Sequence, residues 1–422
     1  MKTSLVSPLS PFAEVASAAL SKSVTVKADR PQQLQSVTIY WRGRKMVLMQ
    51  RPQRRLSALL CKMLRRSWQN LFGTLVRAVG VGAMAAALTA QAGVVGSPPP
   101  GTLPTGGVVQ YGTVNNLGAG GNIAASTGNQ LTLQQTSNQA IIDWQSFSIG
   151  SSAGVKFVQN NANSVALNRV TGTDPSIIMG SLSANGKIFL INAAGVLVGK
   201  TGKIDVAGFT ASTLNISNDD FLAGKMNFAA DAGKTIGDVK IEAGGAITTK
   251  SGGSVYLVGA NVENNGIITA PDGEVLLAAG SSVQLADTSL PGVTINVGGI
   301  DGKVTNLGQI IASAGTIGIG AALIDNSGII NASSVEKQGG RIFLRATKQL
   351  TTDATSKINA DGVTGGNVQL YSDQVANIDG DVSALGSAGN GGYVDTSGKT
   401  VLSVQYVPRV GLGGEWFIDP HD

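Results

Sequence analysis

The sequence predicts an all-β solenoid, in which short strands wind into coils that stack along one axis. The main observation is a repeated motif, Gly-x-Val/Ile-x-Leu/Ile. It begins at Gly186, Gly237, Gly253, Gly273, Gly315, Gly340 and Gly366, with a partial copy at Gly392. Apolar residues two positions apart share one face of a strand, and a period of about 20 residues is typical of solenoid coils. We therefore expect these residues to form one continuous interior, with Lys187, Ser254, Glu274 and Arg341 facing water.

A companion motif, Asn-x(0–1)-Gly-x-Ile, predicts the corners of the coils. It occurs at Asn265, Asn306 and Asn326. Gly and Asn supply the positive φ angles of tight corners, and we expect some corner asparagines to stack in ladders. The 42-residue spacing between Gly273 and Gly315 is interpreted as two coils with one degraded motif. About 300 residues then give about 15 coils and a rod of about 70 Å.

Residues 1–92 are interpreted as a leader because their charge differs from that of the remaining chain. They carry a net charge of +12, whereas residues 93–422 carry −7. A cationic segment, an apolar stretch ending at Ala90, and the small-residue site Ala90-Gln91-Ala92 follow one another as in a secretory signal peptide. Cleavage is predicted after Ala92, with Gly93 as the mature N-terminus. Since the basic charge belongs to the leader, the mature chain is not expected to bind nucleic acid.

The start of the leader and the segment after it complete the N-terminal organisation. Residues 1–50 admit two interpretations: an extended signal region, or a translation start that lies later, at Met46, Met49 or Met63. Residues 93–107 are rich in Pro and Gly and are predicted to be a linker. Residues 108–165 do not follow the 20-residue period and are predicted to cap the open end of the solenoid.

The sequence does not favour an enzyme, a metal site or a cofactor. The only histidine is His421 and the only cysteine is Cys61, so neither a Ser-His-Asp triad nor an HExxH zinc motif is present. The Asp219-Asp220 pair and the Asp379/Asp381 pair are interpreted as turn residues. Two sequons, at Asn215 and Asn331, leave glycosylation open.

Four ordered segments carry a family resemblance. They are IIDWQSFSIG (141–150), VKFVQNNANSVALNRVTG (155–172), SLSANGKIFLINAAGVLVG (181–199) and GFTASTLNISNDDFLAG (208–224). Together they resemble the two-partner secretion domain of filamentous haemagglutinins, with the high-molecular-weight adhesin branch as the nearest match. The resemblance covers roughly residues 110–415. It implies a right-handed, single-stranded parallel β-helix with an N-terminal β cap, in which 108–330 is the secretion domain and 331–422 adds further coils.

The resemblance also implies partners and a location. The Sec machinery would deliver the chain to the periplasm, and a dedicated outer-membrane β-barrel transporter with periplasmic domains would secrete it to the surface of a Gram-negative bacterium. The expected function is adhesion to a host or bacterial surface receptor, with carbohydrate as a candidate ligand. The alternatives are the delivery portion of a contact-dependent toxin or haemolysin, or a β-helix polysaccharide-degrading enzyme. The end at Asp422 is expected to reflect a truncated gene, a fragment of a longer exoprotein or a short natural relative.

Three short motifs are the candidate secretion determinants: Asn168-Arg169, Asn185-Gly186, and the turn from Asn192 to Gly195. The last of these stands where the family usually has Asn-Pro-Asn-Gly, so its turn chemistry is weaker. Each motif also has a structural interpretation, in which the side chains serve coil corners. Trp144 and Phe147 are expected to pack in the core of the cap.

Overall fold

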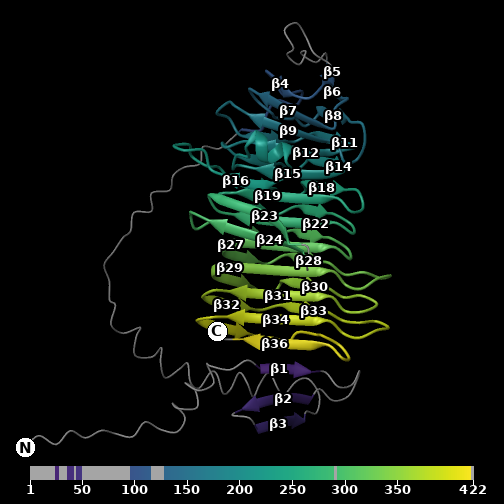
Figure 1. The fold of residues 1–422 in the computed structure, drawn as a ribbon, viewed down its shortest axis with the longest axis vertical. Helices are drawn as coiled ribbons and strands as arrows, with labels where there is room; N and C mark the ends of the chain where they lie inside the picture. The colour runs from purple at the N-terminus through teal and green to yellow at the C-terminus, as the bar shows by residue number, and fades with distance from the viewer. Residues whose placement is uncertain are drawn as a thin grey trace, which may run out of the picture.

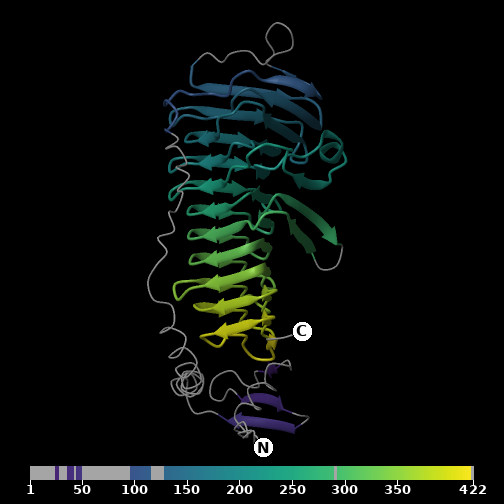
Figure 2. The ribbon, with the colours of Figure 1, turned by 90° about the vertical axis from the view of Figure 1, so that its left-hand side faces the viewer.

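The computed structural model describes residues 24–27, 36–41, 44–49, 96–115, 128–288 and 292–419. Nearly all of its regular elements are β-strands, and they stack into a rod (Figures 1 and 2). Among the described residues, no helix is long and apolar enough to cross a membrane. The predicted all-β class and parallel β-helix are confirmed.

Three walls of strands enclose the interior of the rod. Wall 1 contains β7 (Gln139–Trp144), β9 (Val165–Val170), β12 (Lys187–Ile191), β15 (Gly208–Ser212), β19 (Ser254–Gly259), β22 (Glu274–Ala279), β27 (Thr316–Asn326), β29 (Arg341–Thr352), β31 (Asn367–Ser372), β34 (Tyr393–Gly398) and β36 (Glu415–Asp419). Wall 2 contains β10 (Ser176–Ile178), β13 (Val196–Val198), β17 (Val239–Ile241), β20 (Val262–Asn264), β25 (Lys303–Asn306), the second halves of β27 and β29, β32 (Val375–Ile378) and β35 (Val401–Val404). Wall 3 contains β6 (Gln130–Gln135), β8 (Gly154–Val158), β11 (Ser181–Ala184), β14 (Lys203–Val206), β18 (Ala246–Thr249), β21 (Ile267–Thr269), β26 (Gln309–Ile311), β28 (Ile329–Asn331), β30 (Lys357–Asn359) and β33 (Asp381–Ser383).

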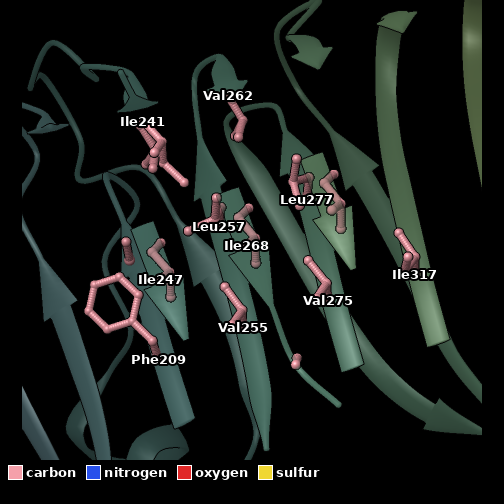
Figure 3. Packing of buried hydrophobic residues seen from close by; sticks show 14 of the residues in the cluster. Phe209, Ile241, Ile247, Val255, Leu257, Val262, Ile268, Val275, Leu277 and Ile317 are labelled. Atoms are coloured by element: carbon pink, nitrogen blue, oxygen red, sulfur yellow. The ribbon is translucent and has the colours of Figure 1, made fainter. Parts of the chain in front are cut away.

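Parallel register places like residues above one another, which creates a continuous core. In wall 1, Val255 pairs with Val275 and Val275 with Ile317 on successive coils. All three side chains are fully buried, and Figure 3 shows them in one row beside Leu257 and Leu277. Each coil alone has strands too short to bury a core, so the stacked neighbours supply the burial.

The glycines of the repeated motif serve close stacking, whereas the positive φ angles expected of corner glycines occur at other glycines. A Cβ on Gly315 would lie 2.1 Å from the carbonyl oxygen of Gly273, and one on Gly340 would lie 2.1 Å from that of Gly315. Positive φ angles fall on Gly252, Asp272 and Ala314, each immediately before a motif glycine. The glycines therefore let one coil corner rest directly on the next.

An asparagine ladder is present, as expected, but it lies in the interior and its first member is Asn264, not the motif residue Asn265. Asn264 Nδ2 donates to Asn306 Oδ1 at 2.8 Å, and Asn306 Nδ2 donates to Asn326 Oδ1 at 2.7 Å. The ladder ends where Asn326 Nδ2 donates to Ser356 Oγ at 2.5 Å. All four residues are buried. Each amide is hydrogen-bonded to the next one along the stacking direction, so its polar groups have partners.

The interpretation of the 42-residue spacing as two coils is wrong. Strand β22 pairs directly with β27, so the chain from Gly273 to Gly315 makes one coil with an inserted hairpin. The hairpin consists of β23 (Ser282–Thr288) and β24 (Gly292–Gly298). Gly237 also belongs to a different wall from Gly253, because β17 pairs with β13 and β20. Wall 1 accordingly has eleven strands in parallel register and not 15 coils.

The N-terminal cap contains antiparallel strands, as expected, but the parallel coils begin earlier than residue 165. Strands β4 (Val108–Tyr111) and β5 (Val114–Asn115) pair antiparallel with β7 and β6. Strands β6 and β8 are already parallel. The preceding Pro/Gly segment is hydrogen-bonded to this end: the backbone N–H of Ser152 donates to Pro100 O at 2.9 Å, and that of Thr105 donates to Ser146 O at 3.0 Å.

Two insertions at the same corner of the coil form a layer outside wall 1. The first carries α3 (Asn218–Leu222) and β16 (Met226–Ala229), and the second is the β23–β24 hairpin. Strands β16, β23 and β24 form an antiparallel sheet, and Figure 2 shows this layer on one side of the rod. At the other end, β1 (Val24–Lys27) pairs with β36, and β2 (Ser36–Trp41) pairs with β3 (Arg44–Met49).

Candidate functional site

Asn168 lies inside the rod, on the second strand of wall 1. It is completely buried, and its Oδ1 accepts a hydrogen bond from Trp144 Nε1 at 3.0 Å. Its Nδ2 donates to the carbonyl oxygen of Phe189 on the next coil at 3.1 Å. Trp144 packs edge-on against Phe147 with ring centroids 5.4 Å apart, so both aromatic residues are core residues of the cap, as expected. Asn168 thus makes hydrogen bonds to both neighbouring coils and links the first three coils.

Arg169 points outward and fastens the outer layer to wall 1. Its Nη2 donates to Ile216 O and to Asn218 Oδ1, both at 2.9 Å, and its Nε donates to Asn215 Oδ1 at 3.2 Å. Nη1 lies 3.5 Å from Asp143 Oδ1 on the neighbouring coil. These contacts give Arg169 the structural role that was one of its two interpretations.

Asn185 and Gly186 form the corner between β11 and β12. The Asn185 side-chain amide makes two hydrogen bonds of 2.7 Å with the backbone of Gln159, accepting from N and donating to O. A Cβ on Gly186 would lie 2.5 Å from the carbonyl oxygen of Ser164. The pair therefore locks the third coil onto the second, and glycine is required by the lack of space.

The segment from Asn192 to Gly195 forms the next corner, between β12 and β13. Asn192 is 1% exposed. Its Oδ1 accepts from Ala194 N at 3.0 Å, and its Nδ2 donates to Asp174 O at 2.9 Å and to Ser176 Oγ at 3.0 Å. Gly195 has a φ of 132°, which disfavours other residues at this position. The Asn-Ala-Ala-Gly sequence therefore makes a defined turn without the Pro and Asn that the family usually has.

The candidate secretion residues come from consecutive coils at the capped end of the rod. Of the six, Asn168, Gly186, Asn192 and Gly195 are buried, Arg169 is half-buried, and Asn185 is exposed. Their polar groups face neighbouring coils and the outer layer. The predicted cleavage residues Ala90, Ala92 and Gly93 lie outside the described residues.

The sequence analysis missed a second apolar core, between wall 1 and the outer layer. One outward-facing ladder runs through Ile141, Leu167 and Phe189, and these side chains are buried. Phe189 meets Phe221 of α3 edge-on, with ring centroids 5.4 Å apart. The available signal was consecutive apolar residues at wall-1 strands, such as Ile188, Phe189 and Leu190, which a strand facing water on one side would not carry.

A hollow of about 500 Å³ lies within the outer layer, between α3 and the antiparallel sheet. Its polar lining includes Asn215, Asp220 and Asp231. Burial tends to raise the pKa of Asp231, but hydrogen bonds from Asn215 and Lys234 outweigh it, so the pKa lies below the ordinary value. Asn215 Nδ2 donates to Asp231 Oδ1 at 2.9 Å, which ties the two ends of the first insertion together.

Comparisons with known proteins give this architecture a family. The model of the TPS secretion domain, where TPS denotes two-partner secretion, matches residues 108–390. The crystal structure of the HMW1 secretion domain from Haemophilus influenzae aligns with a TM-score of 0.60 at 28% sequence identity, covering 75% of this chain and 100% of that chain.

Two curated proteins are also similar in sequence to this chain. A heme/hemopexin-binding protein of Haemophilus influenzae is 31% identical over 312 residues, which is 71% of this chain and 33% of that protein. A second protein of the same name and species is 45% identical over 94 residues, or 22% of this chain and 10% of that protein. The chain thus spans about a third or less of each relative. It belongs to the two-partner secretion domain family.

Proposed function

We propose that the secreted chain acts as a non-enzymatic adhesin at the cell surface. The observation that carries this proposal is the similarity to the HMW1 secretion domain over the whole length of that domain, together with the resemblance of residues 141–224 to the adhesin branch. A receptor on a host or bacterial surface would be the ligand. The rod geometry supports this role, because stacked coils present long walls of side chains.

The carboxylate pairs have structural partners, which supports the proposal that the chain is not an enzyme. Asp381 receives two hydrogen bonds from Arg409, of 2.9 and 2.6 Å. Asp379 Oδ1 accepts from Gly380 N at 2.7 Å. Asp219 and Asp220 lie in the first turn of α3, where acidic side chains favour the helix. Each pair therefore has a structural reason to be present.

We further propose that export depends on the ability of residues 108–330 to form the first coils. The contacts of Asn168, Asn185 and Asn192 join consecutive coils, so replacing them would weaken the start of the stack. The leader of residues 1–92 would deliver the chain through the Sec machinery, and the transporter would receive it unfolded. Residues 331–422 would extend the rod without being needed for export.

A second candidate function is binding of heme or hemopexin. It is favoured by one observation, the names of the two curated relatives. Absorbance titration of the purified chain with hemin, and pull-down with hemopexin, distinguish the two functions. A shifted heme absorption band or hemopexin capture would favour the second candidate.

Adhesion is tested by expressing the chain in a non-adherent Gram-negative host, with and without its transporter. We expect attachment to cultured epithelial cells only when both proteins are present. The matched control is a variant lacking 181–199, which should remain inside the host and give no attachment. Secretion of the chain to the surface without any gain in attachment would contradict the adhesin function while leaving two-partner secretion intact.

A further inference from the structure

The outer face of wall 1 changes character along the rod. In the first coils it is apolar and covered by the outer layer. From β31 onward it carries polar, charged and aromatic side chains that are partly exposed, and Figure 2 shows the last coils without that layer. We call the outward-facing positions of β31, β34 and β36, with Arg341 and Arg345 of β29, the bare face. Phe343, the outward residue between these two arginines, is buried in the second core and is not part of it.

The bare face can be followed along one ladder of outward positions. Leu276 pairs with Gly318, which pairs with Phe343; the next two rungs are Gln369 and Asp395, and the last is Phe417. The alternate residues Val368 and Val394 face the interior and are completely buried. The ladder therefore changes from apolar residues to a mixture of polar and aromatic residues although the fold underneath is unchanged, so the core does not require these residue types.

Aromatic rings and hydrogen-bonding groups alternate on the bare face. Tyr393 and Phe417 lie on adjacent strands and are both partly exposed. Asp395 lies two residues after Tyr393 on β34, pairs with Phe417 and accepts a hydrogen bond from Ser397 Oγ at 2.5 Å. Tyr371 on the next strand is flanked by cations, with Arg345 Cζ 5.3 Å and Lys399 Nζ 5.9 Å from its ring centroid. Tyr393 and Phe417 thus provide apolar surface beside groups that donate and accept hydrogen bonds.

The charges of opposite sign on the bare face are separated along the axis. Arg341 and Arg345 lie on β29, at one end, and the carboxylates of Asp395, Glu415 and Asp419 lie on β34 and β36, at the other. An acidic polymer lying along the axis would meet the carboxylates, and a basic polymer would meet the arginines. A long ligand that spans both ends is therefore favoured when it is uncharged and has hydroxyl groups that both donate and accept.

We propose that the bare face binds a neutral, linear polysaccharide that lies along the axis of the rod. Sugar rings would stack on Tyr393 and Phe417, and sugar hydroxyls would bond to Gln369, Asp395 and Arg345. Four strands at a spacing of about 4.8 Å present one row of side chains for each of about four sugar units. The proposal rests on the proposed surface-binding function and specifies the ligand class and the place where it binds.

The test measures binding of the purified, folded full chain to neutral linear hexasaccharides of glucose, galactose, mannose or N-acetylglucosamine by isothermal titration calorimetry. We expect at least one of them to bind. Tyr393→Ala should weaken that binding about tenfold, and Gln369→Ala, which removes a partly exposed side chain, should also weaken it. The matched control is Tyr406→Ala: Tyr406 is 61% exposed in the same coil as Tyr393 but lies off the bare face, so its loss should leave affinity unchanged.

Four results would overturn the proposal. They are no binding to any of the neutral hexasaccharides, stronger binding to a polyuronate hexasaccharide, equal losses in the Tyr393 and Tyr406 variants, and a wild-type dimer that Tyr393→Ala converts to a monomer. Circular dichroism melts confirm that the variants are folded. Hexasaccharide binding in vitro together with absent cell attachment would sink the adhesin function and leave the saccharide site standing, whereas attachment unaffected by Tyr393→Ala would show that adhesion uses another surface.

Discussion

The two ends of wall 1 share one backbone geometry but differ in what their outer faces meet. Near the cap, Ile141, Leu167 and Phe189 face outward and are buried by α3 and the antiparallel sheet. In the last coils, Gln369 and Asp395 occupy the same ladder and are partly exposed. The comparison teaches that the solenoid core dictates only the inward residues. The outward residues depend on what covers them, as the apolar residues under the inserted layer show.

The largest loss of stability is expected from a charge placed inside the rod. This loss should be similar at both ends of wall 1. Leu277→Asp places a carboxylate in a completely buried position without a partner, so we expect loss of the cooperative fold, by several kcal/mol. Arg345→Glu reverses an exposed, outward charge and should shift stability by about 0.5 kcal/mol or less. Equal shifts in thermal melts would contradict the assignment of inward and outward faces.

The two ends of wall 1 are compared most directly by one outward-facing substitution at each end. Phe189→Ala removes a ring from the second core and should destabilise the chain by about 3–5 kcal/mol. Gln369→Ala, in the same ladder on the bare face, should cost about 0.5 kcal/mol or less. Chemical denaturation of the two variants measures both values. A similar cost for the two would mean that the outer layer contributes little packing.

A smaller effect is expected from the asparagine ladder. Asn306→Ala removes the central member and leaves the buried amides of Asn264 and Asn326 each without one partner. The expected loss of stability is about 1–3 kcal/mol. The control is Asn265→Ala, because Asn265 directly follows Asn264 but is half-buried and is not a member of the ladder. An unchanged melting temperature for Asn306→Ala would show that the ladder is not a source of stability.

The smallest effect concerns the pH dependence of Asp395. Burial, reinforced by the nearby Asp419, raises the pKa of this carboxyl above its ordinary value of 3.8, although the Ser397 hydrogen bond acts in the opposite direction. The folded chain then holds a proton that the unfolded chain has lost, so stability falls as pH rises from 3.8 through the folded pKa. Asp395→Asn should therefore raise the melting temperature at pH 7 and have less effect below pH 3.8. A lower melting temperature at pH 7 would contradict this sign.

The inward-facing core residues can be predicted from the sequence, whereas most contacts of the outward-facing residues cannot. Period-2 apolar pairs such as Val255 and Leu257 identify the core, because a solenoid interior accepts only apolar or fully paired side chains. The inserted hairpin escaped prediction because it merely lengthens the interval between Gly273 and Gly315, and a missing coil motif lengthens it equally. Among the candidate site residues, Asn185 and Asn192 were located correctly at corners. Their hydrogen-bond partners lie on other coils and could not be inferred from local sequence.

The most direct measurement is the export of a passenger protein fused after residue 330, in cells with or without the cognate transporter. We expect the passenger in the medium only when the transporter is present, with no further requirement for residues 331–422. Deleting 181–199 should retain the passenger in the periplasm, whereas Ala193→Pro with Ala194→Asn should not, since it restores the commoner turn. Efficient export of a fusion lacking 141–224, or export without any transporter, would contradict the account that the capped first coils are what the transporter secretes.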